Sequence, residues 1–293
     1  MLQPVSHSKQ RLKARNFMLF LALLPLTGCV ENPFGDDEIS SGTRQVSGTV
    51  LLRDGASSEG AYIWLESFNV GTRADANGKF SLLLPPPGAQ GGGGATGLFD
   101  LYFYLANYSV TTASVVTRNG AFVYSQADIN KQGELNSAKS LVKFLRIHTA
   151  LTPSVVPSSS TQPIGVSVTL QALGDSVTTI NPNTVSGSNI IGALLIRNLE
   201  RQDVFIYNVL PLATYREILF LRASQGDTLD GTLSLIGLPL PPGNYEVIPY
   251  ILIRHQRLPM GMIAALGPDL ESLSPNYLQI PMRREGGRLQ VTQ

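Results

Sequence analysis

The chain of 293 residues has 22 Lys and Arg against 21 Asp and Glu, a near-neutral balance that gives no electrostatic case for nucleic-acid binding. Its single cysteine excludes an intramolecular disulfide and a zinc site built from cysteines, and we expect neither a metal nor a cofactor. With 28 Gly and 19 Pro among many branched side chains, the composition indicates short strands joined by turns, and hence an all-β fold.

Residues 1–28 have the pattern of a secretory signal peptide. Four basic residues precede an apolar run, Phe17 to Leu26. That run falls short of the ~20 residues that a membrane-spanning helix needs. Removal of residues 1–28 would leave a net charge of −3, because four basic and no acidic residues lie there.

The signal peptide ends in Leu26-Thr27-Gly28-Cys29. This stretch resembles the lipobox of bacterial lipoproteins. The resemblance implies cleavage between Gly28 and Cys29, a diacylglycerol group on the sulfur of Cys29, and an acyl chain such as palmitate on the new amine. Two or more chains make membrane anchoring stable where one is marginal.

The residue that follows the cysteine is Val30 rather than Asp. By analogy with Gram-negative lipoproteins, this favours the outer membrane. We therefore expect a cell-envelope protein that is attached to the membrane through Cys29. An ordinary cleaved signal and an uncleaved anchor remain as alternatives.

Residues 29–44 are polar, acidic and turn-prone, which is typical of a flexible tether. Asp36, Asp37 and Glu38 could be calcium ligands. Adjacent carboxylates on a tether are more often simply solvated, and we favour that interpretation.

From Gln45 onward, apolar residues alternate with polar ones, and turn signals separate the runs. The alternation predicts that one face of each strand points inward. The predicted inward sets are Val46, Gly48, Val50 and Leu52; Ala61, Ile63 and Leu65; Phe80, Leu82 and Leu84; and Leu101, Phe103 and Leu105.

This order resembles the carboxypeptidase regulatory-like domain. The matching stretches are Gly48–Val50, Gly60–Leu65, Thr72–Phe80 with its Asp75-Ala-Asn-Gly78 turn, and Leu84–Gly88. The resemblance implies a transthyretin-like β-sandwich over residues 45–151 but no particular function, because such domains are accessories in many surface proteins.

Residues 152–163 are rich in Pro and Ser, which predicts a linker. Residues 164–293 then show turn signals at intervals of about ten residues, which predicts a second β-sandwich of the immunoglobulin-like type. The expected strands are 166–170, 190–197, 204–210, 218–222, 232–236 and 245–253. Further strands are expected at 260–266, and at 277–282 paired with 289–291.

No familiar catalytic motif occurs after Cys29. His148 and His255 are not in an HExxH arrangement, and no Gly-x-Ser-x-Gly is present. A hydrolase built from scattered residues would need one of these histidines near a carboxylate and a hydroxyl. The Asp75–Gly78 stretch fails as an EF-hand, because Pro86 stands where a Glu ligand is needed.

Four aromatic residues form the most informative pattern. If their neighbours point inward, Tyr62, Trp64, Tyr102 and Tyr104 share the opposite face of the sheet. Such a face could bind a protein partner or stack against a glycan. It could also pack against the second domain, which is the interpretation we favour.

These features predict a non-enzymatic, lipid-anchored envelope protein whose two sandwiches bind a protein partner or support a surface assembly. The alternative is a carbohydrate-binding lipoprotein that uses the four aromatic residues. A hydrolase is the third hypothesis.

Overall fold

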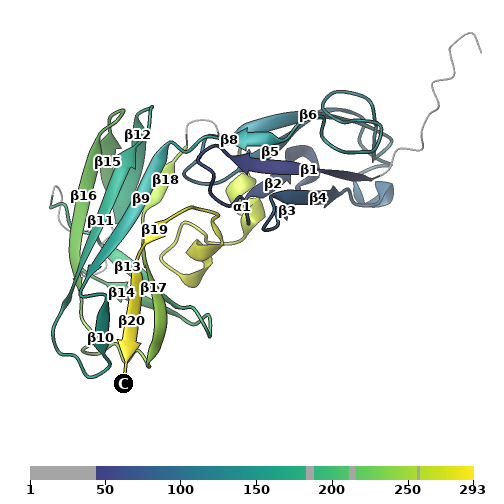
Figure 1. Cartoon of the computed structure of the whole chain (residues 1–293). Coiled ribbons are helices and arrows are strands. Elements are labelled where there is room, and N and C mark those ends of the chain that lie inside the picture. Colours follow the sequence, from purple (N-terminus) through teal and green to yellow (C-terminus); the bar gives the residue numbers. More distant parts are fainter. Residues whose placement is uncertain (1–43, 183–187, 211–215, 256–257) are drawn as a thin grey trace, which may run out of the picture. The chain divides into compact units, whose positions relative to one another are not determined.

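The computed structural model describes residues 44–182, 188–210, 216–255 and 258–293. The lipobox with Gly28 and Cys29, and the tether acidic residues, lie outside this range. Residues Ser40–Gln293 form one compact unit. Its secondary structure is almost entirely β, arranged as two β-sandwiches in tandem (Figure 1), which confirms the predicted fold class.

Two sheets make up the first sandwich. One has the strand order β4-β1-β8 and the other β3-β2-β5-β6-β7. The strands are β1 (Gln45–Leu52), β2 (Tyr62–Leu65), β3 (Val70–Arg73), β4 (Lys79–Leu83), β5 (Gly97–Tyr104), β6 (Thr111–Arg118), β7 (Ala121–Phe122) and β8 (Lys139–Leu141), with short 3-10 turns η1 (Glu66–Phe68) and η2 (Pro87–Ala89).

The core of this sandwich holds side chains from one face of each sheet. The predicted inward sets are confirmed, because their apolar members are buried together in one cluster. Strand alternation places every second residue on the same face, and burial of that face stabilises the pairing register.

The predicted turn at Asp75–Gly78 joins β3 to β4, which belong to different sheets. The Asp75 carboxylate accepts backbone N–H bonds from Asn77 at 2.8 Å and Lys79 at 2.9 Å. Gly78 has φ +75°, and a Cβ there would lie 2.3 Å from the carbonyl oxygen of Val50. Only glycine fits this position without strain.

The second sandwich contains three sheets, with the orders β16-β11-β9-β19, β10-β20-β17-β13-β14 and β15-β12-β18. Side chains from all three meet in one core. The strands are β9 (Leu145–Thr152), β10 (Val155–Pro157), β11 (Ile164–Ala172), β12 (Val177–Pro182), β13 (Ala193–Asn198), β14 (Val204–Asn208), β15 (Arg216–Leu221), β16 (Gly226–Leu233), β17 (Gly243–Pro249), β18 (Leu252–Arg254), β19 (Glu285–Gly286) and β20 (Arg288–Thr292).

The boundary between the sandwiches differs from the predicted linker at 152–163. β9 pairs with β11 of the second sandwich over eight residues, from Leu145 to Thr152, and β10 lies inside the predicted linker and pairs with β20. The chain therefore passes from one sandwich to the other at residues 142–144. Pro and Ser enrichment marked a β-turn region with an edge strand, where proline is tolerated.

Two of the predicted C-terminal strands are wrong. Residues Met262–Leu266 form the short helix α1, and Pro275–Gln279 form the 3-10 helix η3. Short apolar runs do not distinguish helix from strand by periodicity alone. The predicted hairpin is also absent from the described residues, because β20 pairs with β17 and β10 instead.

Candidate functional site

The four aromatic residues of the sequence analysis lie on neighbouring strands, as alternation predicts. Tyr62 pairs with Tyr104, and Trp64 pairs with Tyr102, across β2 and β5. The Trp64 and Tyr102 rings are 6.1 Å apart and tilted by 43°. The indole N–H of Trp64 donates to Oδ1 of Asn69 at 3.3 Å.

This aromatic face is covered. The exposed fractions of Tyr62, Trp64 and Tyr104 are 7%, 2% and 2%, and all three belong to the core cluster of the second sandwich. Tyr102 is half-buried against the same cluster. These three rings therefore do not form an exposed platform for a glycan or a protein, and they pack against the second sandwich, which is the interpretation favoured above.

The covering segment comes from residues 258–283, far along the sequence. The Tyr62 hydroxyl lies 3.5 Å from the carbonyl oxygen of Ala265 in α1. The Arg73 guanidinium stacks 5.9 Å from the Tyr62 ring centroid and donates to the carbonyl oxygen of Gln279 at 2.7 Å. We call the region where the two sandwiches meet the junction.

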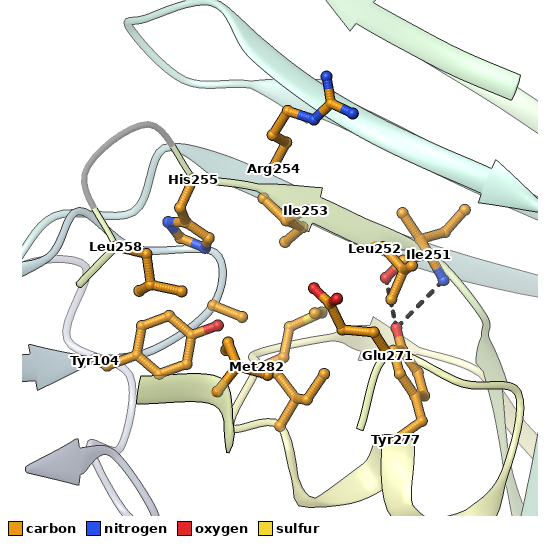
Figure 2. A pocket seen from close by; sticks show the side chains of 13 residues that line it. Tyr104, Ile251, Leu252, Ile253, Arg254, His255, Leu258, Glu271, Tyr277 and Met282 are labelled. Carbon is orange, nitrogen blue, oxygen red and sulfur yellow. Dashed lines mark hydrogen bonds between the residues drawn. The ribbon is translucent and has the colours of Figure 1, made fainter. Parts of the chain in front are cut away.

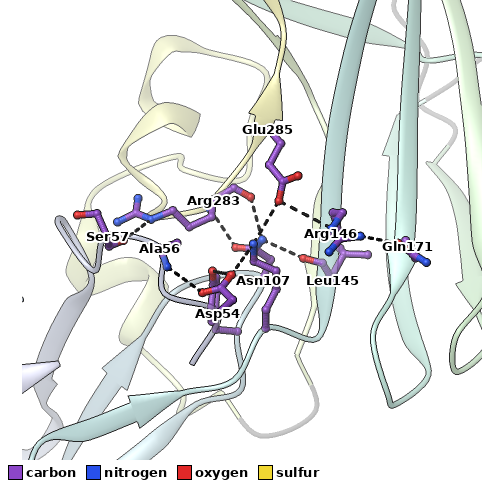
Figure 3. A network of polar contacts seen from close by, with 11 residues as sticks. Asp54, Ala56, Ser57, Asn107, Leu145, Arg146, Gln171, Arg283 and Glu285 are labelled. Carbon is purple, nitrogen blue, oxygen red and sulfur yellow. Dashed lines mark hydrogen bonds and ion pairs between the residues drawn. The ribbon is translucent and has the colours of Figure 1, made fainter. Parts of the chain in front are cut away.

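Asn107 is the central polar residue of the junction. It follows β5 and is fully buried. Its Nδ2 donates to the carbonyl oxygens of Leu145 at 2.9 Å and Arg283 at 2.8 Å, and its Oδ1 accepts the backbone N–H of Arg283 at 2.9 Å (Figure 3). One amide side chain thus satisfies three backbone groups of the second sandwich.

The Arg283 side chain reaches back to the first sandwich. Its Nε donates to the carbonyl oxygen of Ser57 at 2.9 Å, and its guanidinium also donates to the carbonyl oxygen of Glu59. Burial lowers the pKa of Arg283, partly offset by the negative charges nearby. The loop between β1 and β2 is therefore connected to the segment before β19.

Lys143, in the crossing segment, lies between two carboxylates. Its Nζ is 2.7 Å from Oδ2 of Asp54 and 3.3 Å from Oε1 of Glu285. The Tyr108 hydroxyl donates to the same Asp54 oxygen at 2.8 Å, and Arg146 lies 3.8 Å from Glu285 (Figure 3). Asp54 and Tyr108 belong to the first sandwich, and Glu285 and Arg146 to the second.

The pKa values in this cluster favour the charged pair. Burial raises the pKa of Asp54, but hydrogen bonds from Lys143 and Tyr108 outweigh it and leave the pKa low. Burial lowers the pKa of Lys143, and its contacts with Asp54 and Tyr108 raise it above the ordinary value. Burial and the bond to Asp54 raise the pKa of Tyr108 to about 12. Asp54 and Lys143 therefore form an ion pair beside the neutral phenol of Tyr108.

A pocket of about 190 Å³ lies beside the aromatic face. Figure 2 shows Tyr104, His255 and Leu258 at one end and Glu271 and Tyr277 at the other, with the Arg254 side chain turned away. Sites for drug-sized ligands usually occupy roughly 300–1,000 Å³. This pocket is large enough for a few water molecules or a very small ligand.

His255 is the titratable group of this pocket. Its ring contacts Tyr104 and Phe144 edge to face, each with centroids 5.5 Å apart. Burial lowers the pKa of His255, against a smaller opposing effect of a hydrogen bond to the Ala106 backbone. Its buried Nε2 has no hydrogen-bond partner among the described residues.

The hydrolase hypothesis needs a histidine next to a hydroxyl and a carboxylate. In the described part of the chain, Nε2 of His255 meets neither. His148 is exposed on β9, opposite Thr169 of β11 and Glu285 of β19. The geometry therefore does not assemble the arrangement that this hypothesis requires around His255.

Sequence reasoning identified the aromatic part of the junction but not its polar part. Asp54, Asn107, Lys143 and Arg283 stand in no sequence pattern that indicates their contacts. Their partners are distant in the chain, up to 226 residues in the case of Arg283 and Ser57. No local pattern in one sequence reports such pairs.

Among the described residues, no helix is long and apolar enough to cross a membrane, and no three His, Cys, Asp or Glu side chains gather as a metal site would need. No protein-family model and no curated protein sequence matches the chain.

Three solved structures that match this chain are distant from it. A variant of BcpA, the major pilin subunit of Bacillus cereus, matches over 69% of this chain and 63% of that one, with 12% identity and a TM-score of 0.23. BcpA itself matches over the same shares at 13% identity and 0.23. The Bacillus anthracis TIE protein matches over 85% of this chain and 34% of that one, at 10% identity and 0.22. The chain thus spans less than two thirds of each, and scores this low transfer no function.

Proposed function

We propose that this chain is a non-enzymatic, lipid-anchored protein of the cell envelope, whose joined sandwiches present a protein-binding or assembly-supporting surface near the membrane. The anchor is Cys29, by the resemblance of Leu26–Cys29 to a lipobox. Residues 29–44 are the tether, and Val30 favours the outer membrane if the cell is Gram-negative.

The main support for this proposal is the junction between the two sandwiches. An aromatic face, the Asn107 bonds and the Lys143 cluster all connect the two sandwiches. Buried apolar area and satisfied buried polar groups together resist relative motion of packed units. Two sandwiches held together in this way are better suited to supporting an assembly or presenting a binding surface than to closing around a ligand.

The glycan-binding alternative depended on exposure of Tyr62, Trp64 and Tyr104. Their burial removes its motivation. The proposal therefore names a protein partner in the envelope, and no glycan.

The anchor is tested with the full chain expressed in a bacterium fed an alkyne-labelled palmitate. The wild type should carry label and sediment with membranes, and Cys29→Ser should lose both. Ser40→Cys in the Cys29→Ser background is the matched control, since it restores a thiol outside the lipobox. Tight membrane retention of unlabelled Cys29→Ser would contradict the anchor.

The partner is tested by cross-linking and pull-down from detergent-solubilised envelopes of the native cell. We expect one stable protein partner with the wild type, and weaker recovery when the junction is disrupted by Asn107→Ala. Recovery of no partner under several detergents and cross-linker lengths would count against the presenting role while leaving the anchor standing.

A further inference from the structure

β15 is the outer strand of the sheet β15-β12-β18, and in the described part of the chain it pairs only with β12. In an antiparallel ladder, an edge strand directs the N–H and C=O groups of alternate residues away from its partner. β15 therefore presents an open row of backbone groups that an added strand can satisfy.

Over residues 218–221, the side chains of this edge are apolar on both faces. Leu219 and Leu221 point into the core, whereas Ile218 and Phe220 are 57% and 63% exposed. Ile180 of β12, opposite Ile218 in the register, is half-buried on the same outer face. The result is an exposed apolar strip along the open edge.

Two other edge strands of the second sandwich, β16 and β10, carry features that discourage pairing. β16 contains Asp227 and Asp230, and β10 has only three residues and ends in Pro157. Charges, prolines and short length are the usual protection of sheet edges. β15 begins with Arg216 and Glu217, and its remaining residues 218–221 are Ile-Leu-Phe-Leu and contain none of these features.

We propose that β15 is a self-association edge, which pairs antiparallel with β15 of a second copy of this chain. An open backbone row is satisfied in full only by another extended strand. A twofold axis perpendicular to the sheet keeps the exposed faces of both strands on the same side, so Ile218 and Phe220 of one copy meet Phe220 and Ile218 of the other. The edge is thus complementary to itself.

The contact is small. Stable protein interfaces bury about 1,200–2,000 Å² in total. One six-residue strand with two exposed apolar side chains from each copy buries less, so the pairing is concentration-dependent. Self-association through β15 goes beyond the proposed function and does not depend on the lipid anchor.

The first experiment is sedimentation velocity of residues 40–293, the compact unit, between low and high micromolar concentration. The unaltered unit should shift from monomer toward dimer. The double variant Ile218→Lys with Phe220→Lys should stay monomeric, because it places like charges across the pair. Leu83→Lys with Leu98→Lys is the matched control, since both side chains are exposed elsewhere, and it should dimerise like the unaltered unit.

The second experiment locates the contact. Residues 40–293 contain no cysteine, so Ile218→Cys provides one labelling site for a nitroxide. Adjacent strands lie about 4.8 Å apart, so the nitroxides of two paired copies should broaden each other's electron paramagnetic resonance spectrum through dipolar coupling. Mixing the labelled protein with an excess of unlabelled protein should remove this broadening. The same label at Leu98→Cys should show none.

A unit that is monomeric at every concentration overturns the proposal, as does a lysine double variant that dimerises normally. Dimers without broadening at position 218 would show association through another surface and would overturn it too.

Discussion

Asn107 shows how one side chain connects two sandwiches. Its amide is fully buried and bonds three backbone groups of residues 145 and 283. The net contribution of a hydrogen bond to folding stability is about 0.5–1.5 kcal/mol, but a buried donor or acceptor left without a partner costs about 1–3 kcal/mol. Truncation of the Asn107 side chain should therefore lower the stability of the fold more than truncation of an exposed side chain does.

Asn107→Ala should lower the free energy of unfolding by about 2–4 kcal/mol, because it leaves buried donors and acceptors without partners. Urea denaturation followed by circular dichroism measures this. Asn208→Ala, at an exposed residue of β14, is the control and should change stability by less than about 0.5 kcal/mol. Equal small effects of the two variants would show that the junction bonds contribute little.

His255 makes stability depend on pH. Burial holds its pKa in the folded state below 6.5, so the unfolded chain binds a proton first as the pH falls. The contribution of neutral His255 is complete above pH ~6.5 and is lost below it, with a slope of at most about 1.4 kcal/mol per pH unit.

Thermal unfolding between pH 8 and pH 5 tests this. The wild type should lose stability below pH ~6.5, and His255→Phe should lose less over the same interval. His148→Gln alters an exposed histidine and should follow the wild type. A His255→Phe profile that coincides with the wild type would remove His255 as the cause.

At the scale of elements, the β2–β5 face and its cover are the informative pair. Strand alternation predicted correctly that Tyr62, Trp64, Tyr102 and Tyr104 share a face, because period two is a property of the strand itself. What covers that face depends on α1 and residues 258–283, whose apolar run is too short to be assigned as helix or strand from its pattern. The same limit explains the error at Met262–Leu266.

Trp64 is the only tryptophan of the chain, so its fluorescence reports on this cover directly. At 2% exposure it should emit in the blue range and resist acrylamide. Ala265→Asp in α1 should shift the emission to the red and speed quenching, because a charge is placed against the aromatic face. Red, readily quenched emission from the wild type would contradict the burial.

At the scale of the whole molecule, the all-β class and the two tandem sandwiches were predictable from composition and turn spacing. The boundary between them was not. Val155–Pro157 is recognisable as a strand only through its pairing with β20, which comes 135 residues later in the register Val155 to Gln290. Likewise, Lys143, Asp54 and Glu285 are ordinary charged residues until the fold brings them together.

Residues 40–144 alone should not behave as an independent domain. They retain the core of the first sandwich, but lose the cover of Tyr62, Trp64 and Tyr104. We expect this fragment to bind a hydrophobic dye and to self-associate, whereas residues 40–293 should not bind the dye. A monomeric fragment with the Trp64 emission of the intact unit would show that the cover is dispensable.

The position of the cover in the chain also sets an order of events during synthesis. Ribosomes make the N-terminal sandwich first, and the residues that cover its aromatic face, 258–283, are among the last to be made. While the chain between Leu141, the end of β8, and residue 258 is being made, Trp64 and its neighbours lack this cover. Newly made chains therefore pass through a period of vulnerability to proteases and to misassociation, and a holding chaperone that recognises exposed aromatic strands would shorten it.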